Sequence, residues 1–224
     1  VAYAGRSMDG SQFKRDTLGL KFQKKNINDV IKQIDAQVDY NYNNHIMDNF
    51  TLRTPPLMEM NHGGMSHWVQ NAKEMQVTRR SINSRLAMTT EWDKFSLITG
   101  IDSQFNKHGR NMIMYAMPKM NVPSYMDMKF ESYGGFGELT YNINESNKLV
   151  SGARIDYSKN DKYDAASNHI DTRKDTLPSA FIRLENTAKQ HDLKSYVGVG
   201  YVERVPDYWE LSSKSFAQPL IDSY

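Results

Sequence analysis

The sequence predicts an all-β protein, an antiparallel transmembrane β-barrel section of about eight strands. Apolar and polar side chains alternate without a break from Ile34 to Asn43. Successive side chains of a strand point to opposite faces, so this segment has one apolar wall and one polar wall. The pattern recurs along the 224 residues, and short and long connections alternate between its repeats. Together these observations are typical of a barrel that crosses a membrane with strands.

The expected strands follow one another with connections of two kinds. We expect them near residues 13–25, 30–46, 77–92, 94–106, 130–142, 148–158, 176–186 and 192–204. Short connections are expected at 26–29, 92–94, 144–147 and 188–192, and long ones at 47–76, 107–129 and 159–175. Outer-membrane barrels have short periplasmic turns and long extracellular loops. The three long connections are therefore expected to share the extracellular rim.

The aromatic residues on the apolar face of the expected strands favour a membrane barrel. The alternative is a soluble sandwich or a lipocalin-like barrel, in which that face would form the core. The aromatic residues are expected near the ends of the strands, with aliphatic residues such as Ile34, Val38 and Ile101 between them. Two aromatic bands around an aliphatic zone match the two interfaces of a membrane. The opposite parity carries residues such as Asp39, Arg85 and Asp102, which are too polar for a small dry core. A wide, wet lumen is expected instead.

Composition excludes several classes of function. The net charge of +2 gives no argument for binding nucleic acid, and the absence of cysteine excludes a disulfide framework, a thiolate zinc site and a cysteine nucleophile. No apolar run approaches the roughly 18 residues of a membrane-spanning helix. The chain shows no helical His-Glu-x-x-His motif, no nucleophile elbow and no phosphate-binding loop. We therefore expect no enzyme activity.

Both ends of the chain are expected on the long-loop side. A complete outer-membrane barrel would begin and finish in the periplasm, and Val1 does not open a signal peptide. The segment 216–224 does not have the pattern of a final membrane strand. Eight strands alone would leave two open edges, which lipid does not tolerate. We expect residues 1–224 to be part of a single, larger barrel domain whose other strands belong to the parent protein.

Methionine is concentrated in two of the long connections, which hold 11 of the 13 methionines. They are Met47, Met58, Met60, Met65 and Met75 in the first, and Met112, Met114, Met117, Met120, Met126 and Met128 in the second. The first connection also carries His62 and His67 around two glycines. Thioether sulfur is a soft donor that prefers Cu(I), and imidazole binds either oxidation state of copper. The alternative is that methionine simply fills irregular loop cores.

Strand register sharpens the metal hypothesis. The third and fourth strands form a tight hairpin centred near Asp93, which places Met75 beside Met112 and Met114 on the neighbouring strand. Alternate side chains of each strand are expected to face the lumen. By this count the lumen-facing positions include Met47, Met75, Met112 and Met114. They are expected to point inward unless a β-bulge reverses one strand.

Two segments resemble a known family. Residues 201–211, with Arg204, Pro206 and a following Glu-Leu, resemble the strand-to-loop passage of TonB-dependent outer-membrane receptors. Residues 9–15 and 45–50, together with the methionine-rich connections, are similar to the copper branch of that family.

The resemblance implies a 22-stranded barrel that holds a plug domain and imports a scarce ligand with energy from an inner-membrane TonB complex. In the copper members it implies a Cys-x-x-x-Met pair from the plug together with methionines of the barrel wall. This chain contains no cysteine, so only wall residues can be carried over. Met75 and Met114 match best, followed by Met47 and Met112. The remaining methionines of the two connections, among them Met58, Met60, Met65 and Met117, would serve capture together with His62 and His67.

These observations lead to one leading hypothesis and two rivals. The leading hypothesis is TonB-dependent import of copper, as Cu(I), across the outer membrane, with outer-membrane lipid and the TonB complex as partners and no organic cofactor. A receptor of the same architecture for a siderophore is the first rival, and the methionine-rich connections speak against it. A passive porin or surface adhesin is the second, and the Arg-x-Pro passage disfavours it.

Overall fold

The computed structural model describes residues 8–117, 119, 121–164, 166–188 and 193–206. Nearly all of this part of the chain is extended. The strands are β1 (Asp9–Lys25), β2 (Ile31–Asp48), β3 (Leu57–His62), β4 (Met65–Gln70), β5 (Lys73–Trp92), β6 (Phe95–Met114), β7 (Val122–Asn142), β8 (Asn147–Tyr163), β9 (His169–Ala188) and β10 (Leu193–Tyr201). In the described part of the chain, no helix is long and apolar enough to cross a membrane.

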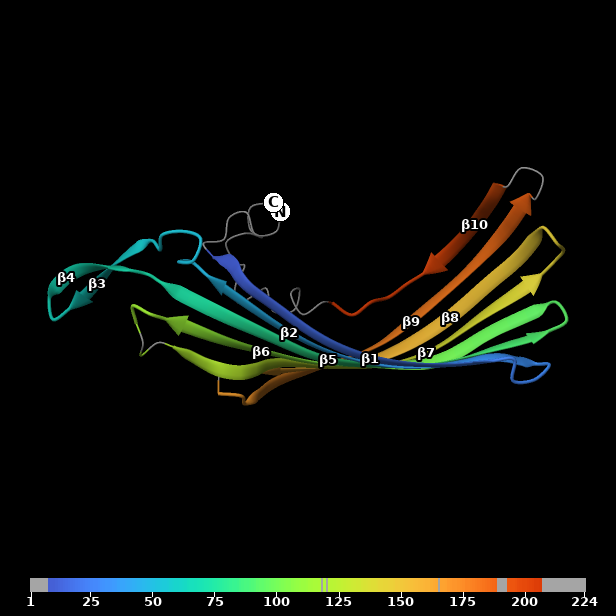
Figure 1. The fold of residues 1–224 in the computed structure, drawn as a ribbon, viewed down its shortest axis with the longest axis horizontal. Helices are drawn as coiled ribbons and strands as arrows, with labels where there is room; N and C mark the ends of the chain where they lie inside the picture. Colours follow the sequence, from blue (N-terminus) through green and yellow to red (C-terminus); the bar gives the residue numbers. More distant parts are fainter. Residues whose placement is uncertain (1–7, 118, 120, 165, 189–192, 207–224) are drawn as a thin grey trace.

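Eight of the strands form one antiparallel sheet in the order β1-β2-β5-β6-β7-β8-β9-β10. The sheet is strongly curved, with the long connections at one end and the short turns at the other (Figure 1). Strands β3 and β4 form a separate two-stranded ribbon that projects from the long-connection end (Figure 1). The predicted all-β, antiparallel architecture is confirmed, whereas the predicted alternation of short and long connections is wrong at 159–175, where only the five residues 164–168 connect β8 to β9.

Most strands are longer than predicted, although β10 ends at Tyr201 and not at 204, and two of the three long connections are mostly strand. β6 continues to Met114 and β7 begins at Val122, so the connection predicted at 107–129 is reduced to 115–121. The connection predicted at 159–175 is reduced to 164–168, and the one at 47–76 contains the unpredicted strands β3 and β4. The alternation stops because neither face has to be apolar above the membrane zone. Backbone pairing does not depend on that alternation and therefore continues.

The short turns use residues that accept a left-handed backbone. Asn26 has a φ of 54° and Asp93 a φ of 49°. Asn and Asp tolerate this region better than other non-glycine residues. The turn at Asp93 joins β5 to β6 so that Trp92 lies opposite Phe95, which fixes the register of this whole hairpin.

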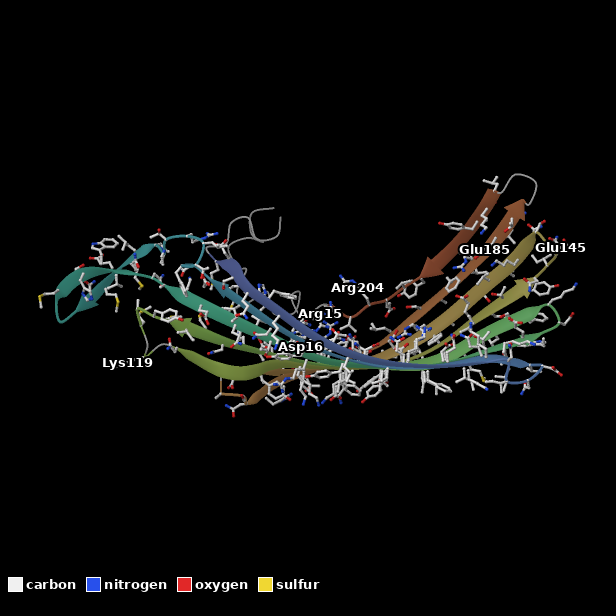
Figure 2. All side chains as sticks on the ribbon, in the orientation of Figure 1. Arg15, Asp16, Lys119, Glu145, Glu185 and Arg204 are labelled. Atoms are coloured by element: carbon white, nitrogen blue, oxygen red, sulfur yellow. The ribbon has the colours of Figure 1, made fainter. Side chains whose placement is uncertain are left out.

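The convex face of the sheet is apolar. The register aligns Val38 and Leu86 on the same face as Ile101 and Ile155, and these side chains are 48–62% exposed. Figure 2 shows mostly carbon atoms projecting from the middle of this face. Aromatic rings flank the aliphatic zone, with Phe95 stacked on Tyr141 at the short-turn end. The apolar residues therefore face outward, as a membrane barrel requires, and not into a dry core.

The concave face is polar and holds a connected ionic group. The Arg154 guanidinium donates two hydrogen bonds to Asp102, at 2.7 and 2.8 Å, and also binds Asp156. A Cβ at Gly134 would collide with this guanidinium, so the glycine provides the space for it. The concave wall is therefore a polar, charged surface.

Candidate metal site

Three methionines share one rung of the sheet near its long-connection end. Met47 of β2 lies opposite Met75 of β5, and Met75 lies opposite Met112 of β6. No bulge interrupts these pairings between the rung and the polar concave wall. Directly opposite residues of an antiparallel pair point to the same face, so all three have the lumen-facing parity. The register predicted for Met75 and Met112 is observed.

Neighbouring methionines on one rung are separated by a single strand spacing. Neighbouring strands lie about 4.8 Å apart, and the methionine side chain is long and flexible. Met47 is 7% exposed, while Met75 and Met112 are half-buried. The three positions therefore form a soft donor row that is shielded but reachable.

Met114 and Met117 continue the donor set beyond the rung. Met114 lies two residues after Met112 on the same face of β6 and pairs with Lys73. Its amide donates to the side chain of Asn121, at 2.7 Å. The amide of Met117 donates to the carbonyl of Met114, at 3.2 Å, which closes a tight turn. Met120 lies outside the described residues.

The loop after Met47 is fixed to the top of the sheet by polar side chains. Asn49 is fully buried, its Nδ2 donates to the carbonyl of Asn71 at 2.8 Å, and its Oδ1 accepts from the amide of Lys73 at 2.9 Å. Arg53 forms an ion pair with Asp9 of β1. These contacts hold the start of β5 next to the end of β2. They position the strand end that carries Met75.

Asp48 orders the same loop and is itself strongly perturbed. Its carboxylate accepts hydrogen bonds from the Phe50 amide and from the amide and hydroxyl of Thr51. Burial alone would raise the pKa of Asp48, but hydrogen bonds from Ser11, Thr51 and Phe50 outweigh it and lower the pKa to about 2. The carboxylate therefore stays ionised throughout the physiological range.

The remaining predicted donors lie on the β3–β4 ribbon. Gly63 and Gly64 have φ values of 60° and 83°, which is the backbone geometry of a two-residue hairpin turn. The register pairs Met58 with Val69 and Met60 with His67. His62 pairs with Met65 in the register, and only its backbone is described. All five predicted donor positions of this ribbon therefore fall on a single face.

The ribbon and the wall differ in burial and support. Met65 is 76% exposed, and Met58 and Met60 are half-buried. β3 and β4 pair with each other and are not part of the main sheet. The predicted donors thus separate into a row supported by the main sheet and a set on a ribbon that pairs only with itself, of which Met65 and His67 are exposed.

Two lumen-facing histidines were not predicted as site residues, and one of them lies opposite Met128, which was assigned only to capture. His45 is two residues before Met47 on the same face of β2. His108 and Met128 lie directly opposite each other on β6 and β7 and are 7% and 4% exposed. Counting alternate residues back along β6 from Met112 would have placed His108 on the same face. It was missed because this stretch was interpreted as loop.

The His108–Met128 pair borders a cavity of about 160 Å³ on the lumen side. Its lining is Arg79, Gln104, His108, Met128, Phe130, Asn160, Val205 and Pro206. The Arg-x-Pro passage therefore reaches the lumen wall at Pro206, while residues 207–211 of that passage lie outside the described residues. Among the described residues, no group of three or more His, Asp and Glu side chains is arranged to hold a metal ion.

A comparison with known proteins identifies the family. The model of the family described as "TonB dependent receptor-like, beta-barrel" matches residues 1–221. The chain belongs to this family of TonB-dependent receptors. Its members are receptors and transporters and not enzymes, in agreement with the prediction from sequence.

Solved structures of receptors and transporters resemble the chain. The structure titled "Copper transporter OprC" is 41% identical, with a TM-score of 0.78, and the match covers 92% of this chain. It covers 33% of the transporter, so the chain spans about a third of that protein's length. The comparison with curated proteins gives no match.

Two iron-complex receptors share the fold at low identity. The ferric yersiniabactin uptake receptor FyuA from Yersinia pestis is 13% identical, with a TM-score of 0.58, and the match covers 83% of this chain and 28% of the receptor. The ferric-catecholate import receptor Fiu from E. coli K12 is 10% identical, with a TM-score of 0.56 and coverage of 87% and 36%. At these identities the similarity concerns the fold alone.

Proposed function

We propose that this chain is a wall section of an outer-membrane receptor that imports copper with energy from a TonB complex. The observation that carries the proposal is the methionine row Met47–Met75–Met112, which lies on three adjacent strands of a TonB-dependent receptor barrel. The 41% identity to a copper transporter supports the same ligand. Copper is the transported cargo, and thioether donors favour Cu(I).

The wall and the ribbon are proposed to have different roles. Met75, Met112 and Met114, with Met47 beside them, would hold the ion at the lumen wall. Met58, Met60, Met65 and His67, with His62 and Met117, would offer weaker encounter positions above it. A thioether has no proton to lose near neutral pH, so protons compete less with copper at the methionines than at a histidine site.

The barrel context of the proposal follows from the family. The strands would be part of one larger barrel domain in the outer membrane, with the plug and the remaining strands contributed by the parent protein. The exposed apolar convex face would contact lipid, and the polar concave face would line the lumen. A siderophore as cargo has less support, because the methionine row offers soft sulfur donors where ferric complexes would need polar or aromatic contacts.

The test uses the intact receptor with Met75→Leu and Met114→Leu combined. We expect Cu(I) affinity to fall about 100-fold or more, because even residues that only support metal ligands cost 10–100-fold when changed. X-ray absorption should show sulfur scatterers around copper in the parent protein and fewer in the variant. Met88→Leu is the matched control, since Met88 is on the same strand but has the outward parity. Unchanged copper binding in the double variant would contradict the assigned wall site.

A further inference from the structure

A row of basic side chains crosses the convex face immediately above the apolar zone. Five adjacent strands each contribute one outward-facing cation: Arg80 of β5, Lys107 of β6, Lys129 of β7, Lys159 of β8 and Lys174 of β9. Two acidic side chains of the same face lie among them, Glu131 and Asp161. The row therefore carries an excess of three positive charges at the long-connection end of the sheet.

The register places these like charges directly against one another. Arg80 lies opposite Lys107, and Lys107 lies opposite Lys129. Lys159 lies opposite Lys174 on the next pair of strands. Like charges directly opposite one another on a sheet face are destabilising. An arrangement repeated three times on one face favours a bound anion that compensates for the repulsion.

The two acidic side chains, Glu131 and Asp161, neutralise only part of the positive charge of the row. Lys129 forms an ion pair with Glu131, and Lys159 with Asp161 at 2.7 Å. Within the residues that the structure describes, no acidic side chain is ion-paired with Lys107 or Lys174. Both side chains are exposed. Two cations are thus available to an external ligand.

A hollow of about 780 Å³ opens on the same convex face, directly below the row. Its outward-facing lining is largely apolar and includes Val38, Leu86, Ile101, Gly135, Ile155 and Tyr157. Lys159 is two residues beyond Tyr157, and Lys174 is two residues before Thr176 on the antiparallel strand, so each lies about 7 Å from the hollow along its strand. The hollow exists because Gly135 faces outward without a side chain, and a Cβ there would meet no atom within 4 Å.

We infer that the basic row and the hollow together bind a phosphorylated, multiply acylated lipid of the outer leaflet. The five strands of the row span about 19 Å at the usual strand spacing, which is too wide for one phosphate and suits a headgroup with two. An acyl chain would occupy the apolar hollow while the phosphates neutralise the row. This lipid site is on the wall opposite to the lumen, so it is separate from the proposed copper site.

The test is native mass spectrometry of the intact, detergent-solubilised receptor with bisphosphorylated lipid A as the probe. We expect Lys107→Ala combined with Lys174→Ala to weaken retention about thirtyfold, since each cation near an anionic surface contributes a factor of about five. Lys24→Ala combined with Lys94→Ala removes the same charge at the short-turn end and should leave retention unchanged. Equal loss in both double variants, or no loss in either, would overturn the assignment.

The hollow and the phosphates are tested independently. Gly135→Leu fills the hollow without an internal clash and should weaken retention, whereas Ala180→Leu adds the same side chain to the outward face beyond the hollow and should not. With the unaltered receptor, dephosphorylated lipid A and phosphatidylglycerol should both bind more weakly than the probe. Equal binding of all three lipids would exclude a site for a headgroup with two phosphates. Copper affinity of the lipid variants should be unchanged, which separates this test from that of the proposed function.

Discussion

The two groups of methionines in this chain differ in how they are supported. The wall group, Met47–Met75–Met112, lies on strands that pair over their whole length within an eight-stranded sheet. The ribbon group lies on β3 and β4, which pair only with each other in the described sheets, and its Met65 is 76% exposed. Donors held by rigid elements can be preorganised for one ion, whereas exposed donors must be ordered on binding. The difference indicates that tight binding belongs to the wall and encounter to the ribbon.

The largest expected effect comes from the centre of the wall row. Met75 has a methionine on each side, whereas Met47 has one at its end of the row. Met75→Leu should therefore weaken Cu(I) binding by roughly 100-fold and Met47→Leu by about tenfold, on the scale typical of changes around metal sites. Competition titration with a Cu(I) chelator measures both. An equal loss of Cu(I) affinity in the two variants would show that Met75 is not the central ligand of the row.

Changing the ribbon should affect the number of ions bound more than the strongest affinity. Met58, Met60 and Met65 replaced together by Leu should leave the tightest site within about twofold, because unsupported donors add little to a preorganised site. The intact receptor should bind fewer Ag(I) ions in a mass-spectrometric titration. If the tightest site weakened as much as in Met75→Leu, the division of roles between wall and ribbon would be wrong.

The buried amide of Asn49 links the two regions. Asn49→Ala leaves the carbonyl of Asn71 and the amide of Lys73 without their partner, which costs about 2 kcal/mol of local opening free energy. Hydrogen exchange at Lys73 should become about thirtyfold faster. Thr54→Ala, at an exposed position of the same connection, should not change that rate. An unchanged exchange rate in Asn49→Ala would show that the side-chain hydrogen bonds of Asn49 do not hold the start of β5.

The smallest effect is a pH dependence of the loop at Asp48. The folded pKa of about 2 lies below the ordinary value of 3.8, so the stabilisation is complete above 3.8 and is lost as the pH falls toward 2. Hydrogen exchange of the Thr51 amide, corrected for its intrinsic pH dependence, should rise only within that window. Asp48→Asn should abolish the dependence. A transition near pH 6 would point to a histidine instead.

The sequence predicted the membrane half of the sheet better than the half above it. Between Ile34 and Tyr42 lipid requires one apolar face, so hydropathy reveals the strand and its orientation. Above that zone, β6 continues through His108 to Met114 with polar side chains on both faces, and no alternation marks it. Strand formation there depends on hydrogen bonding to the neighbouring strands, which cannot be seen in the side-chain pattern of one strand.

The candidate site was predictable to the same extent. Parity from the Asp93 turn correctly placed Met75 against Met112, because the hairpin between them contains no bulge. The ribbon was missed since the strands Leu57–His62 and Met65–Gln70 are short, although Gly63–Gly64 is a strong hairpin signal. His108 lies on the same face of β6 as Met112, but placing it and Met128 by counting alternate residues required treating 107–129 as strand and not as loop.

The most direct test is an anomalous difference map of the intact receptor crystallised with Ag(I), a stable substitute for Cu(I). The strongest peak should lie on the lumen side at the Met47–Met75–Met112 rung, in contact with the sulfur of Met75, and weaker peaks should lie along the ribbon. A strongest peak on the ribbon, or none within contact of Met75, would contradict a wall site for copper.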